Sequence, residues 1–361
     1  MNREIGSDFW EISLEDKINN VFWWESEKYK TKYFISGRNA LLGLCRLLES
    51  SKKRVILPGY TCSTVIDPFI QEKWKIEYYD INIDLSINIA SLEKLIKEFK
   101  PTAILLHAYF GFKFKNNIEK ILKLAKDNHI FIIEDLTQNL LSGEKNIEAN
   151  FYISSMRKFL AVPDGGILIS NEEIMLECCE EKKQLIELSN KAFELKKVYM
   201  NTNDKETKKR FRELYVECHN ILALNDELVN VSQQTLEIYK KTDLKKIKEK
   251  RLKNFNLLCE RLKTNKKIRL IYKRARDTVI PLYLPLYVLN NEREVLQKYL
   301  ADNNIYCPII WPRYNIIPQM SKETEYIYDN ILCIPIDQRY DDKDMEYIAQ
   351  KITEFERRGA R

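Results

Sequence analysis

Residues 130–170 read IFIIEDLTQNLLSGEKNIEANFYISSMRKFLAVPDGGILIS, a stretch in which apolar runs alternate with polar connections. Three of these runs have the length and the branched and aromatic residues of strands: IFIIEDL (130–136), FYISS (151–155) and GGILIS (165–170). They are apolar almost throughout, as expected for strands covered by helices on both faces. Asp135 lies at the end of the first run, and Lys158 follows the second. The stretch therefore predicts part of a buried sheet with charged groups at one edge.

The same alternation continues towards the N-terminus. Further strand-like runs are RVILPGY (54–60), KIEYYDI (75–81) and TAILLHAYFG (102–111). Between them, Ser91–Lys100 and Asn117–Asn128 have the spacing of amphipathic helices. Strands separated by helices indicate βαβ units and a mostly parallel sheet, which binds ligands at the carboxyl ends of its strands.

The second half of the chain has a different pattern. Residues 171–262 are helical and charged and predict a long connecting helix that leaves the first domain. After them come two strand-like runs and two helical ones: 278–288, 303–311, 290–302 and 341–358. We therefore expect an α/β fold with a large domain at residues 1–245, built on a mostly parallel sheet flanked by helices. A small α+β domain follows at 246–361.

Composition excludes several classes of protein. The chain has 361 residues, 45% hydrophobic and 31% charged, which is typical of a soluble globular protein. It has no apolar run of about 18 residues and no signal-peptide layout at its start, so we expect a cytoplasmic protein without a membrane segment. Eight cysteines without a CxxC pair, and only three histidines, argue against a metal centre. Basic runs at 205–212 and 243–253 alternate with acids, which indicates solvated helix faces rather than a nucleic-acid site.

Two short elements have a place in cofactor chemistry. Ser36 precedes Gly37 and the apolar stripe of a helix, and a helix start of this kind can bind a phosphate. It can equally be an ordinary capped helix. Asp135 at a strand tip points into the crevice where such sheets bind ligands, and pyridoxal 5′-phosphate (PLP) requires an acid beside its ring nitrogen. A strand-end aspartate can also cap a turn.

The third element is Lys158, which follows a short strand and precedes Asp164-Gly165-Gly166 and another strand. A lysine that forms a Schiff base must be partly desolvated, so that its amine is neutral and nucleophilic. A surface lysine at the start of a loop is the alternative. The three elements in this order, on successive strands, predict a PLP enzyme.

With these residues in place, the chain resembles the DegT/StrS-type aminotransferases, the sugar-nucleotide branch of the aspartate aminotransferase fold (fold type I). The resemblance covers most of the chain, through SGRNAL (36–41), VILPGYTC (55–62), HAYFG (107–111), IIEDLTQ (132–138), SSMRKFLAVPDGG (154–166) and NIYCPIIW (304–311). It implies that Lys158 forms the Schiff base and shuttles a proton, and that Asp135 pairs with the pyridine nitrogen. It also implies that Gln138 hydrogen-bonds the ring oxygen. The implied phosphate ligands are Ser155 and the backbone at Gly37 and Arg38.

The chain departs from that family at two places. Cys62 stands where an aromatic residue usually covers the PLP ring, so either Tyr60 or the thiol itself would take that role. Ile153 stands where a phosphate-binding serine is usual, so Ser154 or Ser155 would replace it.

The resemblance implies a homodimer that transfers an amino group, from glutamate, onto a nucleotide-linked keto-sugar for surface polysaccharide or secondary-metabolite synthesis. Asn230 is the candidate residue that crosses from the second subunit. Dehydrating relatives have histidine in place of the lysine, so Lys158 favours amination. The alternatives are a non-catalytic PLP-fold binding or regulatory protein, and a PLP enzyme with a non-sugar substrate. A nucleotide-binding module without PLP lacks its motifs, since no GxGxxG or GxxxxGK[ST] occurs.

Three residues near these motifs are further candidates. For Arg157 we expect a salt bridge to a neighbouring helix, with an anionic substrate group as the alternative. Trp311 and Arg313 are candidates for the substrate entrance, and Trp311 is equally a candidate for the core of the small domain.

Overall fold

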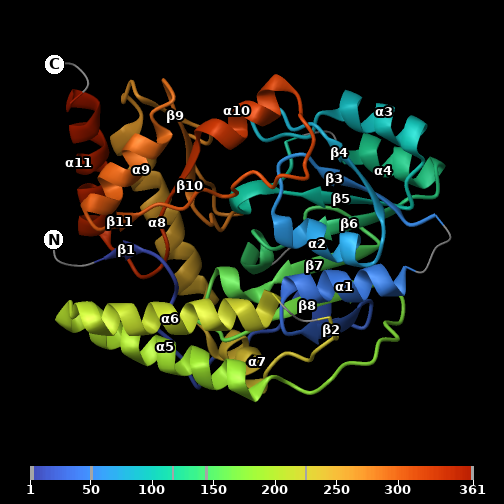
Figure 1. Ribbon diagram of the computed structural model, residues 1–361, viewed down its shortest axis with the longest axis horizontal. Coiled ribbons are helices and arrows are strands. Elements are labelled where there is room, and N and C mark those ends of the chain that lie inside the picture. Colours follow the sequence, from blue (N-terminus) through green and yellow to red (C-terminus); the bar gives the residue numbers. More distant parts are fainter. Residues whose placement is uncertain (1–3, 49–51, 116–117, 143–144, 224–225, 359–361) are drawn as a thin grey trace.

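A seven-stranded sheet in the order β2-β8-β7-β6-β5-β3-β4 forms the larger part of the molecule (Figure 1). The computed structural model describes residues 4–48, 52–115, 118–142, 145–223 and 226–358. The strands of this sheet are β2 (Lys30–Phe34), β3 (Arg54–Pro58), β4 (Lys75–Tyr79), β5 (Ala103–His107), β6 (Phe131–Asp135), β7 (Phe151–Ser155) and β8 (Gly166–Ser170).

Six of the seven strands run in one direction. The pairs from β4 through β3, β5 and β6 to β7 are all parallel, whereas β8 is antiparallel to both of its neighbours, β7 and β2. The predicted mostly parallel α/β sheet is confirmed. The edge strand β2 was not expected from the sequence, because KTKYF has charged residues at its start and is only partly buried.

Four helices connect these strands: α1 (Gly37–Leu47), α2 (Ser63–Gln71), α3 (Ile89–Phe99) and α4 (Ile118–Asp127). The side chain of Ser36 caps α1 by accepting a hydrogen bond from the Asn39 backbone N–H at 3.1 Å. Helices α3 and α4 correspond to the two predicted amphipathic helices, although Asn117, the predicted start of the second, lies outside the described residues.

The expected long connecting helix at 171–262 is wrong. The structure has four helices there: α5 (Lys183–Thr202), α6 (Lys205–Ala223), α7 (Gln233–Lys241) and α8 (Leu244–Leu262). Asn203 adopts a left-handed conformation (φ 54°) that ends α5 and reverses the chain. Helices α5 and α6 therefore form a hairpin, seen at the lower left of Figure 1. It is held together by a small apolar cluster that includes Phe193, Phe211 and Trp10.

A second, smaller unit contains the antiparallel sheet β12-β10-β9, with β9 (Ile268–Leu270), β10 (Leu284–Val288) and β12 (Ile331–Ile334). Its helices are α9 (Arg293–Asp302), α10 (Lys322–Asn330) and α11 (Asp342–Arg358). The short strand β1 (Ile5–Gly6) pairs in parallel with β11 (Ile305–Tyr306), so the N-terminal segment lies against this unit. The predicted division at 245/246 falls inside α8 and stays a prediction.

Three predicted strands are much shorter in the structure, each for its own reason. Carbonyls at 281 and 282 accept hydrogen bonds from Arg251 at 3.1 and 3.0 Å, so β10 begins only at Leu284. The run at 303–311 forms a strand only at β11, since Pro308 has no N–H to donate. The run at 102–111 ends as a strand at His107 and turns through Phe110, which has φ 58°.

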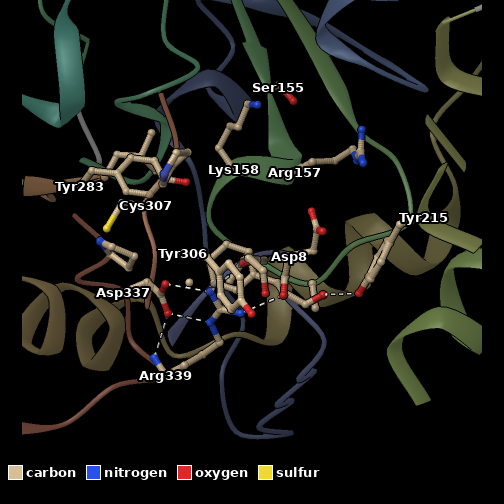
Figure 2. A pocket seen from close by; sticks show the side chains of 18 of the residues that line it. Asp8, Ser155, Arg157, Lys158, Tyr215, Tyr283, Tyr306, Cys307, Asp337 and Arg339 are labelled. Atoms are coloured by element: carbon tan, nitrogen blue, oxygen red, sulfur yellow. Dashed lines mark hydrogen bonds and ion pairs between the residues drawn. The ribbon is translucent and has the colours of Figure 1, made fainter. Parts of the chain in front are cut away.

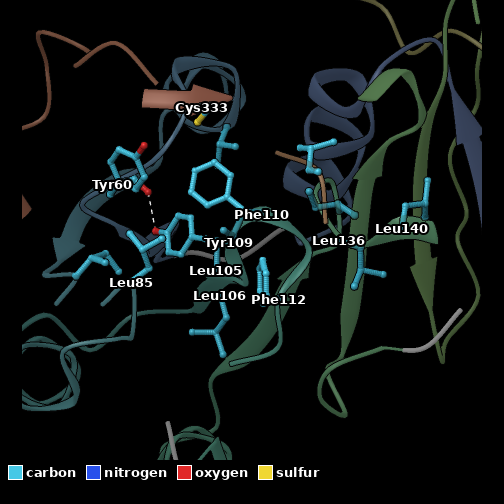
Figure 3. Packing of buried hydrophobic residues seen from close by; sticks show 14 of the residues in the cluster. Tyr60, Leu85, Leu105, Leu106, Tyr109, Phe110, Phe112, Leu136, Leu140 and Cys333 are labelled. Carbon is cyan, nitrogen blue, oxygen red and sulfur yellow. Dashed lines mark hydrogen bonds between the residues drawn. The ribbon is translucent and has the colours of Figure 1, made fainter. Parts of the chain in front are cut away.

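That turn joins the two units. It forms the short helix η2 (Tyr109–Gly111), and Leu282 N donates to Phe110 O at 3.0 Å. The Tyr109 hydroxyl donates to the backbone carbonyl of Tyr60 at 2.7 Å, within the apolar packing drawn in Figure 3. Three further one-turn helices are η1 (Trp23–Glu25), η3 (Leu140–Ser142) and η4 (Met156–Lys158). Within the described ranges, no helix combines the length and the apolar composition that a membrane crossing needs.

Substitution of Gly111 by alanine should destabilise this junction. Gly111 has φ 89°, and a Cβ there would clash with the backbone carbonyl of Ile280. We expect the free energy of unfolding to fall by roughly 1–3 kcal/mol in denaturant titration. The control is Gly43→Ala in α1, where the new Cβ meets only side-chain atoms at 3.1 Å and the loss should be smaller. An equal loss in the two variants would contradict this explanation.

Candidate active site

The polar groups of the site lie at the carboxyl ends of three neighbouring strands. In the parallel register, His107 at the end of β5 is opposite Asp135 at the end of β6, and Asp135 is opposite Ile153 of β7. Ser155 ends β7, and the one-turn helix η4 then carries Lys158. Because parallel strands end at the same edge of a sheet, side chains distant in sequence meet there.

Asp135 is buried and held as an anion. Its carboxylate lies 3.3 Å from His107 Nδ1 and accepts a hydrogen bond from the Thr137 backbone N–H at 2.8 Å. Burial by itself would raise the pKa of this carboxyl, but His107 and Thr137 outweigh burial and lower the pKa below its ordinary value. His107 Nε2 is buried and has no hydrogen-bond partner in the described part of the chain.

The Lys158 side chain is surrounded by protein atoms but is exposed to a cavity. Burial among protein atoms lowers the pKa of its amine, and the neighbouring charge of Arg157 lowers it further, whereas Cys62 and Asp135 act in the opposite direction. Its side chain is nevertheless exposed, because it faces a cavity. A lowered pKa increases the fraction of neutral amine, which is the nucleophilic form.

The cavity has a volume of about 560 Å³, within the usual range for small-molecule sites. Figure 2 shows Lys158 and Arg157 on one side of it and the ion pair of Arg339 with Asp337 (2.7 Å) on the other. Its walls come from four parts of the chain: η4, the N-terminal segment 6–9, the α5–α6 hairpin and the small unit.

The N-terminal segment is held in place by its backbone. Lys196 of α5 and Arg339 both donate to the carbonyl of Asp8, at 2.6 and 2.9 Å, and Tyr215 of α6 donates to the carbonyl of Phe9 at 2.9 Å. The Asp8 carboxylate is therefore presented to the cavity near Lys158 and Arg157 (Figure 2). No motif in the sequence could have indicated Asp8, because its position depends on contacts across the whole chain.

The predicted phosphate ligands are only partly together. Gly37, the first residue of α1, lies against Ser155, since a Cβ at Gly37 would be 3.1 Å from the Ser155 Cβ. Ser155 is partly exposed and lines the cavity. Ser154 is fully buried, and its hydroxyl donates to the Ser155 carbonyl at 3.5 Å. The Arg38 side chain turns to Asp67 at 3.1 Å, so only its backbone remains for a phosphate.

The remaining predicted cofactor residues surround Asp135. Gln138 is buried, and its side-chain oxygen accepts a hydrogen bond from Phe110 N, which leaves the amide nitrogen as its donor end. Cys62 precedes α2, accepts a hydrogen bond from Thr64 at 3.0 Å and is partly buried. Tyr60 is fully buried, and its hydroxyl donates to the Ile310 carbonyl.

The C-terminal candidates have separate positions. The Trp311 ring packs 5.4 Å from the rings of both His107 and Tyr60, so it lies beside the Asp135 site as well as against the core. Arg313 forms an ion pair with Glu325 and donates to the Pro318 carbonyl at 2.7 Å. Asn230 is exposed and forms a backbone bridge with Phe34.

These residues fit PLP chemically. An anionic carboxylate is available for a protonated ring nitrogen, an amide donor for the ring oxygen, a lysine amine for the aldehyde, and a helix start with a hydroxyl for the phosphate. His107, which holds Asp135, was not assigned a role from the sequence. Its signal was its place at the end of the strand next to that of Asp135.

A mostly parallel sheet with a carboxylate and a lysine at its carboxyl edge, joined to a small antiparallel sheet, defines the class of this protein as a fold type I aminotransferase. The chain belongs to the DegT/DnrJ/EryC1/StrS aminotransferase family, whose model matches residues 28–353. The family is one of PLP-dependent sugar aminotransferases.

Solved structures support the fold at low sequence identity. Helicobacter pylori PseC, an aminotransferase involved in the biosynthesis of pseudoaminic acid, is 16% identical with a TM-score of 0.65, over 90% of this chain and 86% of that one. S. venezuelae DesV, in complex with a ketimine intermediate, is 15% identical with a TM-score of 0.64, over 90% and 84%. Bacillus subtilis NtdA with bound cofactor PMP is 16% identical with a TM-score of 0.65, over 91% and 73%.

Asp135→Asn should weaken PLP binding, because a neutral amide cannot stabilise the protonated ring nitrogen. Loss of one charge-assisted hydrogen bond corresponds to roughly 10- to 100-fold in affinity. Titration of the absorbance of protein-bound PLP measures it.

Glu134→Gln is the matched control. Glu134 is the preceding residue on β6, is buried, and binds Asn146 at 2.6 Å instead. Burial raises the pKa of Glu134 to about 7, so glutamine resembles its protonated form. We expect little change in PLP affinity, and equal losses in the two variants would argue against the assigned role of Asp135.

Proposed function

We propose that this protein uses PLP to transfer an amino group from an amino acid, glutamate, to a keto-sugar carried on a nucleotide. The observation that carries the proposal is the arrangement of Lys158 and Asp135 in a chain of the sugar aminotransferase family. One is an amine of lowered pKa that faces a cavity, and the other is a buried carboxylate held as an anion. This pair meets the two acid–base requirements of the chemistry.

PLP, when bound, supplies an electron sink that stabilises the negative charge left after a proton is removed from the amino-bearing carbon. Asp135 would hold a proton on the ring nitrogen, which that sink requires. His107 Nδ1 supports Asp135 as an anion, and the Thr137 N–H fixes the orientation of its carboxylate. Gln138 would donate to the ring oxygen from its amide nitrogen.

Lys158 has two tasks in this proposal. Its neutral amine would bind the cofactor before a substrate arrives, and the same amine would then move the proton that leaves the substrate carbon. A base works best when its pKa lies near the working pH. Burial and the charge of Arg157 both lower the pKa of Lys158 in that direction.

The cavity offers polar groups for a sugar. Tyr283 and Tyr306 line it with Asp8, and hydroxyls and a carboxylate can hydrogen-bond the hydroxyl groups of a hexose. Similar solved structures include a sugar aminotransferase from Micromonospora echinospora, 13% identical with a TM-score of 0.61 over 89% of this chain and 86% of that one. They support a sugar acceptor. Surface polysaccharide or secondary-metabolite synthesis is the pathway we propose.

Lys158→Ala should abolish transamination. Wild-type protein with PLP should show the yellow absorbance of a Schiff base, which borohydride should reduce to a stable bond on Lys158. Glutamate should convert the yellow absorbance to that of the amino form of the cofactor. The alanine variant should show neither, because no amine is present to bind the cofactor covalently or to move the proton. Activity retained in the variant would disprove the role of Lys158. Trapping in the wild type without any response to an amino acid would favour a non-catalytic binding protein.

We also propose a homodimer, in which Asn230 of each subunit reaches towards the site of the other. Asn230 is exposed, which such a role requires. Sedimentation velocity at micromolar concentration should give the mass of two chains, and Asn230→Ala should weaken PLP binding without changing that mass. A monomer that is fully active would remove this part of the proposal.

A further inference from the structure

Arg157 is a partly exposed cation on the wall of the cavity. The sequence led us to expect a salt bridge to a neighbouring helix. In the described part of the chain, however, its guanidinium makes no hydrogen bond and no ion pair. It lies one residue before Lys158 and lines the same cavity. Burial lowers the pKa of Arg157, but a guanidinium keeps its proton in a protein. A cation largely surrounded by protein atoms is costly unless something neutralises it.

Asp164 and Asp8 are the two carboxylates that attract Arg157, and among the described residues neither forms an ion pair with it. Asp164 is occupied by Ser232, whose backbone N–H and hydroxyl donate to it at 2.8 and 2.7 Å, and by the hydroxyl of Thr235. Asp8 attracts Arg157 across the cavity without an ion pair between them. The positive charge of Arg157 therefore remains available to a ligand.

Ser155 lines the same cavity as Arg157, and the start of α1 packs against Ser155. In the view of Figure 2, Ser155 stands between the side chains of Lys158 and Arg157. Gly37, the first residue of α1, packs against Ser155, so the positive end of an 11-residue helix is directed at the same place. A hydroxyl, a helix start and a guanidinium are groups that bind phosphate.

His219 adds a further donor from α6. Its neighbour Cys218 packs against Ile35, directly before the cap of α1, and Arg38 donates to the Ala223 carbonyl at 3.2 Å. These contacts hold the end of α6 against the beginning of α1. His219 lines the cavity near Arg157, and burial and the charge of Arg157 lower its pKa. An imidazole N–H can donate to an anion in either protonation state.

We propose that Arg157 and His219, together with Ser155 and the first turn of α1, bind the phosphate group of the cofactor. The inference rests on the proposed function, because it requires PLP as the ligand. A substrate carboxylate is the other anion that could meet Arg157. The phosphate is favoured because Ser155, which packs against the start of α1, lines the same cavity as the guanidinium, and because Ser154 and Ile153 are buried and cannot contribute.

The test compares PLP with pyridoxal, which lacks the phosphate but keeps the aldehyde. Apparent dissociation constants come from the absorbance of the lysine-bound ligand, in wild type and Arg157→Met. We expect the substitution to weaken PLP binding roughly 10- to 100-fold and to leave pyridoxal binding nearly unchanged. Arg157→Lys, which keeps the charge, should fall between wild type and Arg157→Met. His219→Ala should lose roughly 2- to 10-fold for PLP alone, as for a neutral hydrogen bond.

Two controls support the comparison. Arg261→Met removes an exposed arginine of α8 that pairs with Glu346 at 2.6 Å, and should change neither dissociation constant. Inorganic phosphate should weaken PLP binding to the wild-type protein and should leave pyridoxal binding unaffected. This second measurement needs no variant, so it tests the site even if Arg157→Met fails to fold.

The outcomes separate this inference from the proposed function. Equal losses for PLP and pyridoxal, or no loss for either, would overturn the phosphate assignment alone. PLP affinity that is unchanged while the half-reaction with glutamate weakens would assign Arg157 to the substrate carboxylate, and would also overturn it. A wild-type protein that binds neither PLP nor pyridoxal would overturn the proposed function and this inference with it.

Discussion

His107 and Asp135 are direct neighbours in the parallel register of β5 and β6, and their 3.3 Å contact at the end of the two strands orders the site around it. Burial alone would make the Asp135 carboxyl a weak acid. The histidine and the Thr137 N–H reverse that effect, so the structure holds a negative charge inside the protein where apolar strands end. A buried charge is stable only with such partners, which explains why this pair lies where two strands end side by side.

The opposite charges follow the next strand, β7. Lys158 and Arg157 lie in η4 and line the cavity, and Asp135 acts electrostatically on the amine of Lys158. Their proximity has a chemical consequence, because the charge of Arg157 lowers the pKa of Lys158 and favours its neutral form. If Arg157 binds a phosphate, one residue both anchors the cofactor and adjusts the amine that reacts with it. The anion of Asp135 and the basic groups of Arg157 and Lys158 thus follow neighbouring strands of one sheet.

The outer wall of the cavity has a different origin. It is built from the N-terminal segment, the α5–α6 hairpin and the small unit, and the backbone carbonyl of Asp8 is where they meet. Lys196 from the hairpin and Arg339 from the small unit both donate to it. Because each of these groups is fixed by the others, the shape of the substrate space depends on the whole chain. Family resemblance through the sheet motifs gives little information about this wall.

The sequence by itself determined the sheet, the class of protein and the residues at the sheet edge. Apolar strands such as IFIIED and ILLH are specified by local composition, and a carboxylate or lysine at a strand end must meet its neighbours once the strands are parallel. Only the tertiary structure decided the course of residues 171–262, the lengths of the strands near 281 and 308, and the placement of Asp8, His219 and Trp311. Three of these features depend on a partner distant in sequence: Arg251 for the carbonyls at 281 and 282, Ile35 for the end of α6, and His107 for Trp311. Such partners leave no periodic pattern in the chain, because periodicity records which face of an element is buried and not which residue covers it.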